Sequence, residues 1–242
     1  MKKDYKGKIE LIENIALDTY KMVILSDLRW ANPAQFISIL CGNKTMRRPF
    51  SISDFEKKEK ESLTTILFKL KGEGTSYLKN LKKGDEIDFL APLGNGFKIE
   101  NKKSLLIGAG IGIAPMLFLK KELNKKNIEN FLISGFKNEN EVIKGSDKTV
   151  IGGSVMDNIE ELIKEKNIEL IYACGPKVVL KMVDELSTKL NTPSQLALEK
   201  VMACSIGVCR GCVIKLIRNN KIQNYSVCKD GPVFFGGEII WE

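Results

Sequence analysis

Residues 107–115, Ile107-Gly108-Ala109-Gly110-Ile111-Gly112-Ile113-Ala114-Pro115, follow the apolar run Ser104–Ile107 and begin a helical pattern. Glycines between a strand and a helix let the backbone approach a pyrophosphate, and the helix N-terminus favours its negative charge. The best match is G-x-G-x-x-P from Gly110 to Pro115, because Ile113 stands where G-x-G-x-x-G needs glycine. This stretch predicts a dinucleotide site, with an ordinary strand-to-helix turn as the alternative.

The residues around this loop alternate between short apolar runs and amphipathic segments. The expected strands are 104–107, 131–134 and 170–173, and the expected helices are 115–126, 155–166 and 176–190. This alternation predicts a doubly wound parallel sheet. Such sheets bind ligands where the carboxyl ends of their strands meet the following loops.

A second loop, Cys174-Gly175-Pro176, also lies between an expected strand and an expected helix. Proline suits the first helical turn, where its missing N–H is not needed. Two loops at one edge of a sheet can together hold both ends of a dinucleotide. The candidate NAD-binding residues are Gly108, Gly110, Gly112, Pro115, Cys174, Gly175 and Pro176.

Residues 1–98 read instead as short strands separated by turns. Five or six such strands with few helices predict a small antiparallel β-barrel. Within it, the Arg48 guanidinium can hold a phosphate, and the Ser51 hydroxyl suits a flavin ring nitrogen. The turn Gly72-Glu73-Gly74-Thr75 offers N–H groups for a second phosphate contact. Taken alone, each feature is also compatible with an ordinary turn.

Four cysteines near the C-terminus follow the pattern C-x4-C-x2-C-x15-C. They are Cys204, Cys209, Cys212 and Cys228. Three thiolates in one tight loop with a fourth from a later segment are typical of a plant-type 2Fe-2S cluster. A zinc site is the alternative, although zinc sites with four cysteines usually come as two separate C-x2-C pairs. Cys41 lies outside the pattern and is expected to be a buried small residue.

Composition excludes several classes of function. The 242 residues contain no histidine, so Ser-His triads, Cys-His pairs and HExxH zinc sites are absent. The net charge of +8 comes from basic residues interleaved with acids, so we expect no nucleic-acid partner. The stretch Ser104–Leu119 is too short for a membrane span. Without an apolar export signal at the N-terminus, the cysteines are expected in the reducing cytoplasm.

Together these motifs resemble those of the ferredoxin-reductase superfamily. Besides the two glycine loops, the similarity lies in R-P-F-S at 48–51, G-x-G-T at 72–75, Pro92–Phe97, and the cysteine block with Cys228–Phe234. Within that superfamily the chain resembles the electron-transfer subunits of type B dihydroorotate dehydrogenase. The resemblance implies a β-barrel for FAD at 1–98, an α/β domain for NAD at 99–193 and a 2Fe-2S domain at 194–242.

The resemblance also assigns residues and a partner. It implies FAD binding by Arg48, Pro49, Phe50, Ser51, Leu67, Phe68, Lys69, Gly74 and Thr75. It places Ser51 near the reactive flavin nitrogen, Cys174 beside the nicotinamide, and the four clustered cysteines on the iron. Phe50 departs from the tyrosine common elsewhere in the superfamily. The implied partner is a catalytic subunit carrying FMN, in a heterotetramer with two copies of each chain.

The implied function is electron transfer in pyrimidine biosynthesis, between the FMN subunit and NAD+ through the cluster and FAD. One alternative is a related subunit of another complex, such as a ferredoxin:NADP oxidoreductase or a sulfide dehydrogenase. Another is a scaffold that holds zinc. The choice of NAD over NADP is open, because Ser134–Glu139 contains no arginine for a 2'-phosphate but includes Lys137.

Overall fold

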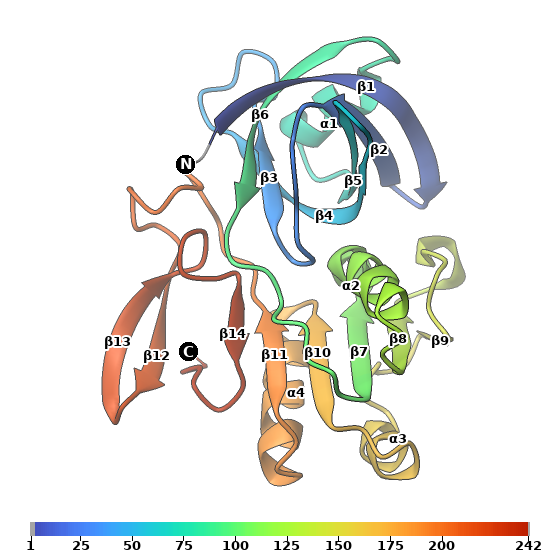
Figure 1. Cartoon of the computed structure of the whole chain (residues 1–242), viewed down its shortest axis with the longest axis vertical. Coiled ribbons are helices and arrows are strands. Elements are labelled where there is room, and N and C mark those ends of the chain that lie inside the picture. The colour runs from blue at the N-terminus through green and yellow to red at the C-terminus, as the bar shows by residue number, and fades with distance from the viewer. Residues whose placement is uncertain (1–2, 242) are drawn as a thin grey trace.

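In the computed structural model, which describes residues 3–241, the first part of the chain closes into an antiparallel β-barrel (Figure 1). The strand order is β1-β2-β5-β4-β3-β6. The barrel elements are β1 (Lys3–Ala16), β2 (Thr19–Ser26), β3 (Phe36–Ile39), β4 (Arg48–Lys57), β5 (Ser62–Lys69), α1 (Glu73–Asn80) and β6 (Glu86–Leu93). Alternate side chains point inward, and Ile9, Met22 and Ile24 are fully buried in the barrel core.

The R-P-F-S stretch lies inside a strand of this barrel. Instead of an ordinary turn, the structure makes Arg48–Ser51 the first residues of β4, paired with β3. Proline and two serines interrupt the apolar alternation of β4, which explains why the pattern does not reveal the strand. The pairing holds this stretch rigidly at the barrel rim.

Below the barrel lies a six-stranded sheet in the order β14-β11-β10-β7-β8-β9 (Figure 1). Five strands are parallel, and β14 joins β11 antiparallel. The elements are β7 (Ser104–Ala109), η1 (Gly110–Gly112), α2 (Ile113–Lys125), β8 (Asn130–Phe136), η2 (Glu139–Glu141), β9 (Lys148–Ile151), α3 (Ile159–Glu165), β10 (Leu170–Cys174), α4 (Lys177–Lys189), β11 (Ser194–Ala197) and β14 (Val233–Phe235). The predicted fold class is confirmed.

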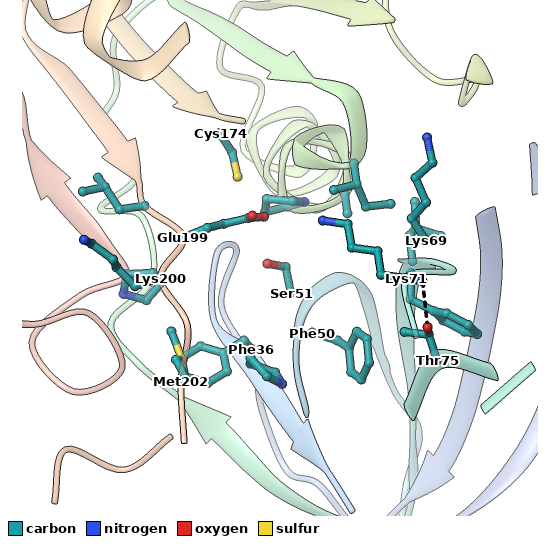
Figure 2. Close-up of a pocket in the computed structure, with 18 residues that line it drawn as sticks. Phe36, Phe50, Ser51, Lys69, Lys71, Thr75, Cys174, Glu199, Lys200 and Met202 are labelled. Carbon is teal, nitrogen blue, oxygen red and sulfur yellow. Dashed lines mark hydrogen bonds between the residues drawn. The ribbon is translucent and has the colours of Figure 1, made fainter. Parts of the chain in front are cut away.

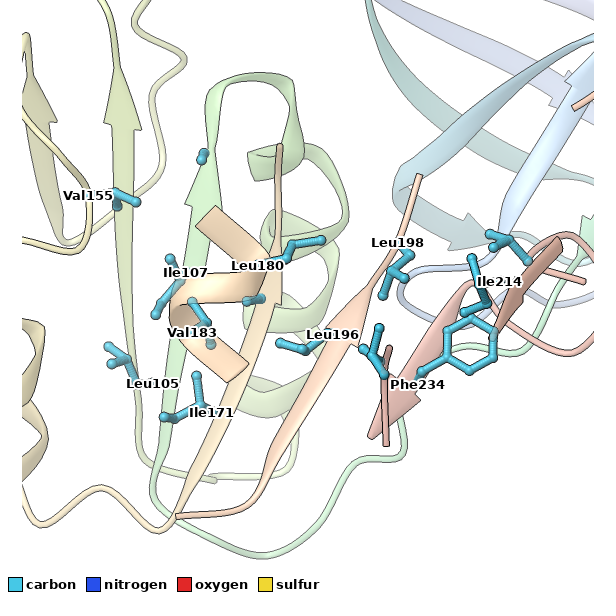
Figure 3. Packing of buried hydrophobic residues seen from close by; sticks show 14 of the residues in the cluster. Leu105, Ile107, Val155, Ile171, Leu180, Val183, Leu196, Leu198, Ile214 and Phe234 are labelled. Carbon is cyan, nitrogen blue, oxygen red and sulfur yellow. The ribbon is translucent and has the colours of Figure 1, made fainter. Parts of the chain in front are cut away.

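The two faces of this sheet are covered by different helices. Leu105 and Ile107 pack in one core cluster with Leu180 and Val183 of α4 (Figure 3). Leu106, between them in β7, belongs to the cluster on the opposite face that includes apolar residues of α2. Successive side chains of β7 therefore point to opposite faces of the sheet, and both faces are buried. A strand buried on both faces is typical of a doubly wound sheet.

The sheet extends beyond the strands that the pattern predicts. Strands β9 and β11 are each four residues long, and β11 contains Ser194 and Gln195, so neither has a clear apolar run. Strand β11 lies in the central sheet although it follows the predicted domain boundary at 193/194. Helix α3 begins at Ile159 rather than at residue 155, because Val155–Asn158 form turns before it.

The C-terminal part consists of the cysteine loop and a hairpin formed by β12 (Val213–Arg218) and β13 (Lys221–Ser226). Its two-residue turn has both Asn219 and Asn220 at positive φ, as a tight hairpin requires. Ile214 packs with Leu198 and Phe234 in the cluster that reaches the sheet (Figure 3). None of the helices within residues 3–241 is long and apolar enough to cross a bilayer.

A buried carboxylate fastens the end of the chain to α4. Asp184 is 5% exposed, and its two oxygens accept hydrogen bonds from the backbone N–H of Gly237 and the indole N–H of Trp241, both at 2.6 Å. Charge-assisted bonds of this kind are stronger than neutral ones. The pair of bonds therefore holds the segment after β14 against α4.

We predict that Asp184→Ala lowers the free energy of unfolding by about 2–4 kcal/mol, because two hydrogen bonds to a buried carboxylate are lost. Thermal unfolding followed by circular dichroism measures the effect. The neighbouring Glu185→Ala is the control, since Glu185 is exposed and forms only a 3.7 Å ion pair with Lys181. Equal melting temperatures for the two variants would contradict this role for Asp184.

Candidate functional site

A cavity of about 230 Å³ lies where the barrel meets the carboxyl edge of the sheet (Figure 2). Residues from both parts and from the segment that leads to the cysteine loop line it. They are Phe36, Pro49, Phe50, Ser51, Leu67, Phe68, Lys69, Lys71, Thr75, Ile111, Ala114, Pro115, Cys174, Leu198, Glu199, Lys200, Met202 and Pro232. One site thus joins three stretches that are far apart in the sequence.

The barrel wall of the cavity contains most of the residues predicted to bind FAD. Seven of them line it: Pro49, Phe50, Ser51, Leu67, Phe68, Lys69 and Thr75. Phe50 packs edge-on against Phe68, with ring centroids 5.9 Å apart, and Phe68 stacks on Tyr20 at 5.7 Å. Lys69 forms a 3.0 Å ion pair with Glu141 of η2. This wall therefore combines the aromatic side chains of Phe50 and Phe68 with the charged side chain of Lys69.

Arg48 and Gly74 do not line the cavity, but they lie beside each other next to it. A Cβ on Gly74 would stand 3.2 Å from both Cγ and Nε of Arg48. The Thr75 hydroxyl accepts hydrogen bonds from the N–H groups of Lys71 and Gly72, at 3.0 and 3.3 Å. The arginine and the G-x-G-T turn are therefore placed together, as a shared phosphate contact requires.

On the sheet side, the two glycine loops pack directly against each other. A Cβ on Gly112 would lie 2.4 Å from the carbonyl oxygen of Cys174, so only glycine permits this approach. Of the seven predicted NAD residues, Pro115 and Cys174 line the cavity. Gly175 and Pro176 line a neighbouring cavity of about 250 Å³ instead, and Leu198–Lys200 form a wall common to both cavities.

Cys174 is buried at the cavity wall. Burial raises the pKa of its thiol well above the ordinary range, and the negative charge of Glu199 raises it further. The group therefore remains a neutral thiol at physiological pH. Sequence reasoning missed Glu199, which follows the unpredicted strand β11. Recognising that strand would have placed Glu199 at the carboxyl edge, where ligands bind.

The four clustered cysteines are brought together in two pairs. The N–H of Cys209 donates to Sγ of Cys204 at 3.3 Å, and the N–H of Cys228 donates to Sγ of Cys212 at 3.4 Å. Cys212 and Cys228 are buried, whereas Cys209 is exposed. Among residues 3–241, no three histidine, cysteine or acidic side chains converge on a single-ion position.

The donor set suits a two-iron cluster. A 2Fe-2S cluster distributes four thiolates over two irons, so two cysteine pairs match its symmetry. Backbone N–H groups also favour the charged form of the Cys204 sulfur. Burial alone would raise the Cys204 pKa, but hydrogen bonds led by the N–H of Cys209 lower it to about 6.

The cysteine-bearing segments form part of the cavity boundary. Met202, two residues before Cys204, and Pro232, four residues after Cys228, both line the cavity. The N–H of Asn95, at the end of the barrel, donates to the carbonyl of Gly231 at 2.6 Å. The cysteine cluster is therefore adjacent to the space between the barrel and the sheet.

Comparisons with known proteins agree with this geometry. A profile of the iron-sulfur cluster binding domain of dihydroorotate dehydrogenase B matches residues 199–240. The dihydroorotate dehydrogenase B (NAD(+)) electron transfer subunit of Caldanaerobacter subterraneus subsp. tengcongensis is 38% identical, covering 98% of this chain and 99% of the relative. The corresponding subunit of Fusobacterium nucleatum is 36% identical over 93% of this chain and 94% of its own length.

The chain belongs to the family of dihydroorotate dehydrogenase B electron transfer subunits. Its fold also matches a solved NADH-dependent reduced ferredoxin-NADP oxidoreductase, with a TM-score of 0.82 and 27% identity over 97% of this chain and 90% of the other. Phthalate dioxygenase reductase, at 16% identity, shares the fold with a TM-score of 0.65 over 93% of this chain and 77% of its own.

Membership in this family confirms several expectations. As an electron transfer subunit of the dihydroorotate dehydrogenase B family, the chain is an oxidoreductase subunit that uses FAD, a 2Fe-2S cluster and NAD(H). The individual cofactor-binding residues stay predictions, supported by their places around the cavity. The zinc scaffold is not favoured, because the matched domain is an iron-sulfur domain.

We predict that Cys228→Ala removes most of the iron and the visible absorption of the purified protein, since one of four ligands is lost. The matched control is Cys41→Ala. Both cysteines are 1% exposed, so the two substitutions remove similar packing contacts. Iron analysis and absorption spectra check the outcome. Normal iron content in Cys228→Ala would contradict the ligand assignment.

Proposed function

We propose that the chain transfers electrons between NAD(H) and an FMN-containing catalytic subunit that acts on dihydroorotate, in a heterotetramer with two copies of each chain. The observation that carries this proposal is the single cavity bounded by the barrel, the sheet and the cysteine-bearing segments. When bound, the flavin and the nicotinamide supply hydride chemistry, and the cluster supplies single-electron chemistry. The chain positions these groups.

We infer the role of each part from its place at the cavity. Residues 1–98 hold FAD, with Ser51 toward the flavin ring and Arg48, Gly74 and Thr75 toward its pyrophosphate. Residues 99–193 hold the nicotinamide nucleotide. Residues 194–242 hold the cluster, although β11 and β14 of this unit are built into the central sheet.

The lining of the cavity suits hydride transfer without a protein acid or base. Phe36, Phe50 and Leu67 present apolar surface that excludes water from stacked rings. Cys174 contributes a neutral thiol, because its pKa is raised by burial. The chain has no histidine to move a proton at neutral pH. We therefore assign proton chemistry on dihydroorotate to the partner.

The surface around the exposed cysteine loop is the place where we expect the partner to dock. Val201 is 89% exposed and Val208 is 75% exposed, and Cys209 and Arg210, which follow Val208, are exposed as well. Exposed apolar side chains of this size mark interaction sites when they gather. Docking there would bring the partner close to the cluster. We place the complex in the cytoplasm, where thiolate ligands stay reduced.

A second candidate function is that of a reductase subunit in another complex. The 0.82 TM-score to the NADH-dependent reduced ferredoxin-NADP oxidoreductase favours it. Both functions use the same cavity and the same cluster, so the partner decides between them. Copurification of the chain from its native source, followed by identification of the bound subunit and its flavin, separates the two.

We predict that the purified chain with its flavin and cluster reduces an artificial acceptor with NADH but does not oxidise dihydroorotate. The reason is that hydride transfer between the bound nicotinamide and flavin needs no protein acid or base, whereas the proton chemistry on dihydroorotate is assigned to the partner. Spectrophotometric assays of both reactions, with and without the partner subunit, test this division. Dihydroorotate turnover by the chain alone would refute it.

We predict that Val201→Glu weakens binding to the catalytic subunit at least about tenfold, because a charge replaces an apolar contact at the interface. The reduction of an artificial acceptor by NADH should stay unchanged. Ile222→Glu is the matched control, since Ile222 is 65% exposed on the hairpin away from the cysteine loop. Equal affinity of both variants, measured by calorimetry, would argue against docking at the cysteine loop.

A further inference from the structure

A buried pair of hydroxyls joins the barrel to the cysteine loop. Ser38 lies on β3 and is 0% exposed, and Ser205, beside Cys204, is 1% exposed. Oγ of Ser38 donates a hydrogen bond to Oγ of Ser205 at 2.9 Å. Ser205 is a variable position of the C-x4-C stretch with no role assigned above, Ser38 belongs to no motif, and neither serine lines the cavity. Their bond connects segments 167 positions apart in the chain.

Ser205 has an unusual backbone conformation. Its φ is +59°, in the left-handed region that residues with a Cβ adopt only at an energetic cost. A buried hydroxyl without a partner would add a further cost. The bond from Ser38 satisfies the Ser205 hydroxyl and holds the residue in this conformation. Ser38 therefore stabilises a turn that the loop sequence does not favour.

This turn shapes the surroundings of the Cys204 sulfur. The backbone N–H of Cys209 donates to Sγ of Cys204 at 3.3 Å, and the backbone N–H groups of Ile206 and Val208 lie close enough to lower the pKa of the same thiol. Successive N–H groups in a loop with left-handed residues form a concave anion site. Hydrogen bonds to cluster sulfurs tune the reduction potential, since they favour the more negative, reduced state.

The same bond fixes the loop relative to the cavity. In the barrel, Ser38 is paired with Pro49 of β4, and Pro49 lines the cavity. Loss of the bond from Ser38 would therefore loosen the cysteine loop from the strand pair that forms the cavity wall.

We propose that Ser38 is a positioning residue for the iron-sulfur cluster: its hydroxyl holds Ser205 in the left-handed turn that directs N–H groups to Cys204. This inference rests on the proposed function, because it requires a cluster on the four cysteines. It assigns a role to a barrel residue that does not line the cavity.

The first test compares Ser38→Ala with the native full-length chain carrying its cluster. Iron release to a chelator should be roughly three- to tenfold faster, the size of effect that the loss of one buried hydrogen bond produces. The midpoint potential of the cluster should move to a lower value, because the N–H donors at Cys204 are less well held. Ser53→Ala is the matched control, since Ser53 is a buried barrel serine bonded to the carbonyl of Thr65 at 3.1 Å.

The second test is rescue by glycine. Adding Ser205→Gly to Ser38→Ala removes the unpaired hydroxyl and lets the loop adopt its positive φ without cost. Iron release and midpoint potential should return toward native values in this double variant. A further loss in the double variant, or an unchanged potential and iron release in Ser38→Ala, would overturn the inference. Native protein without iron would instead refute the proposed function, so the two failures are distinguishable.

Discussion

The arrangement of the barrel, the sheet and the cysteine-bearing unit depends on the segment after Cys228, which is hydrogen-bonded to the barrel on one side and to the chain that follows β11 on the other. The carbonyl of Gly231 accepts a 2.6 Å hydrogen bond from Asn95 of the barrel, and the carbonyl of Pro232 accepts one from Leu198 at 2.9 Å. The chain then enters the sheet as β14. A Cβ on Gly94 would lie 2.6 Å from Pro232, so the approach is close. The last cysteine is consequently held between the barrel and the sheet.

This constraint explains why one cavity serves three parts of the chain. The barrel contributes rigid strand residues, because the R-P-F-S stretch is paired with β3 rather than free in a loop. The sheet contributes two loops in van der Waals contact at Gly112. The cysteine-bearing segments close the remaining side with Met202 and Pro232. Electron transfer between cofactors needs such proximity, and the shared cavity provides it.

The sequence reveals the parts of this architecture whose signals are local. The alternation around residues 107–115 predicts the central sheet, and the cysteine spacing predicts the cluster loop. Strands β9, β11 and β14 escape detection because they have only four, four and three residues and depend on distant partners. The sequence also does not reveal which cavity each residue of a loop lines. The sequence pattern assigns Cys174, Gly175 and Pro176 to one site. In the structure, Cys174 lines one cavity, whereas Gly175 and Pro176 line its neighbour.

The position of β14 also affects how the protein is made. During synthesis, β11 leaves the ribosome well before Val233–Phe235, so one edge of the central sheet stays unpaired until that later segment emerges. The cysteine loop lies between these two strands in the chain. Completion of the sheet and enclosure of the cysteine loop therefore depend on the same pairing of β14 with β11, which ties the C-terminal unit structurally to the sheet.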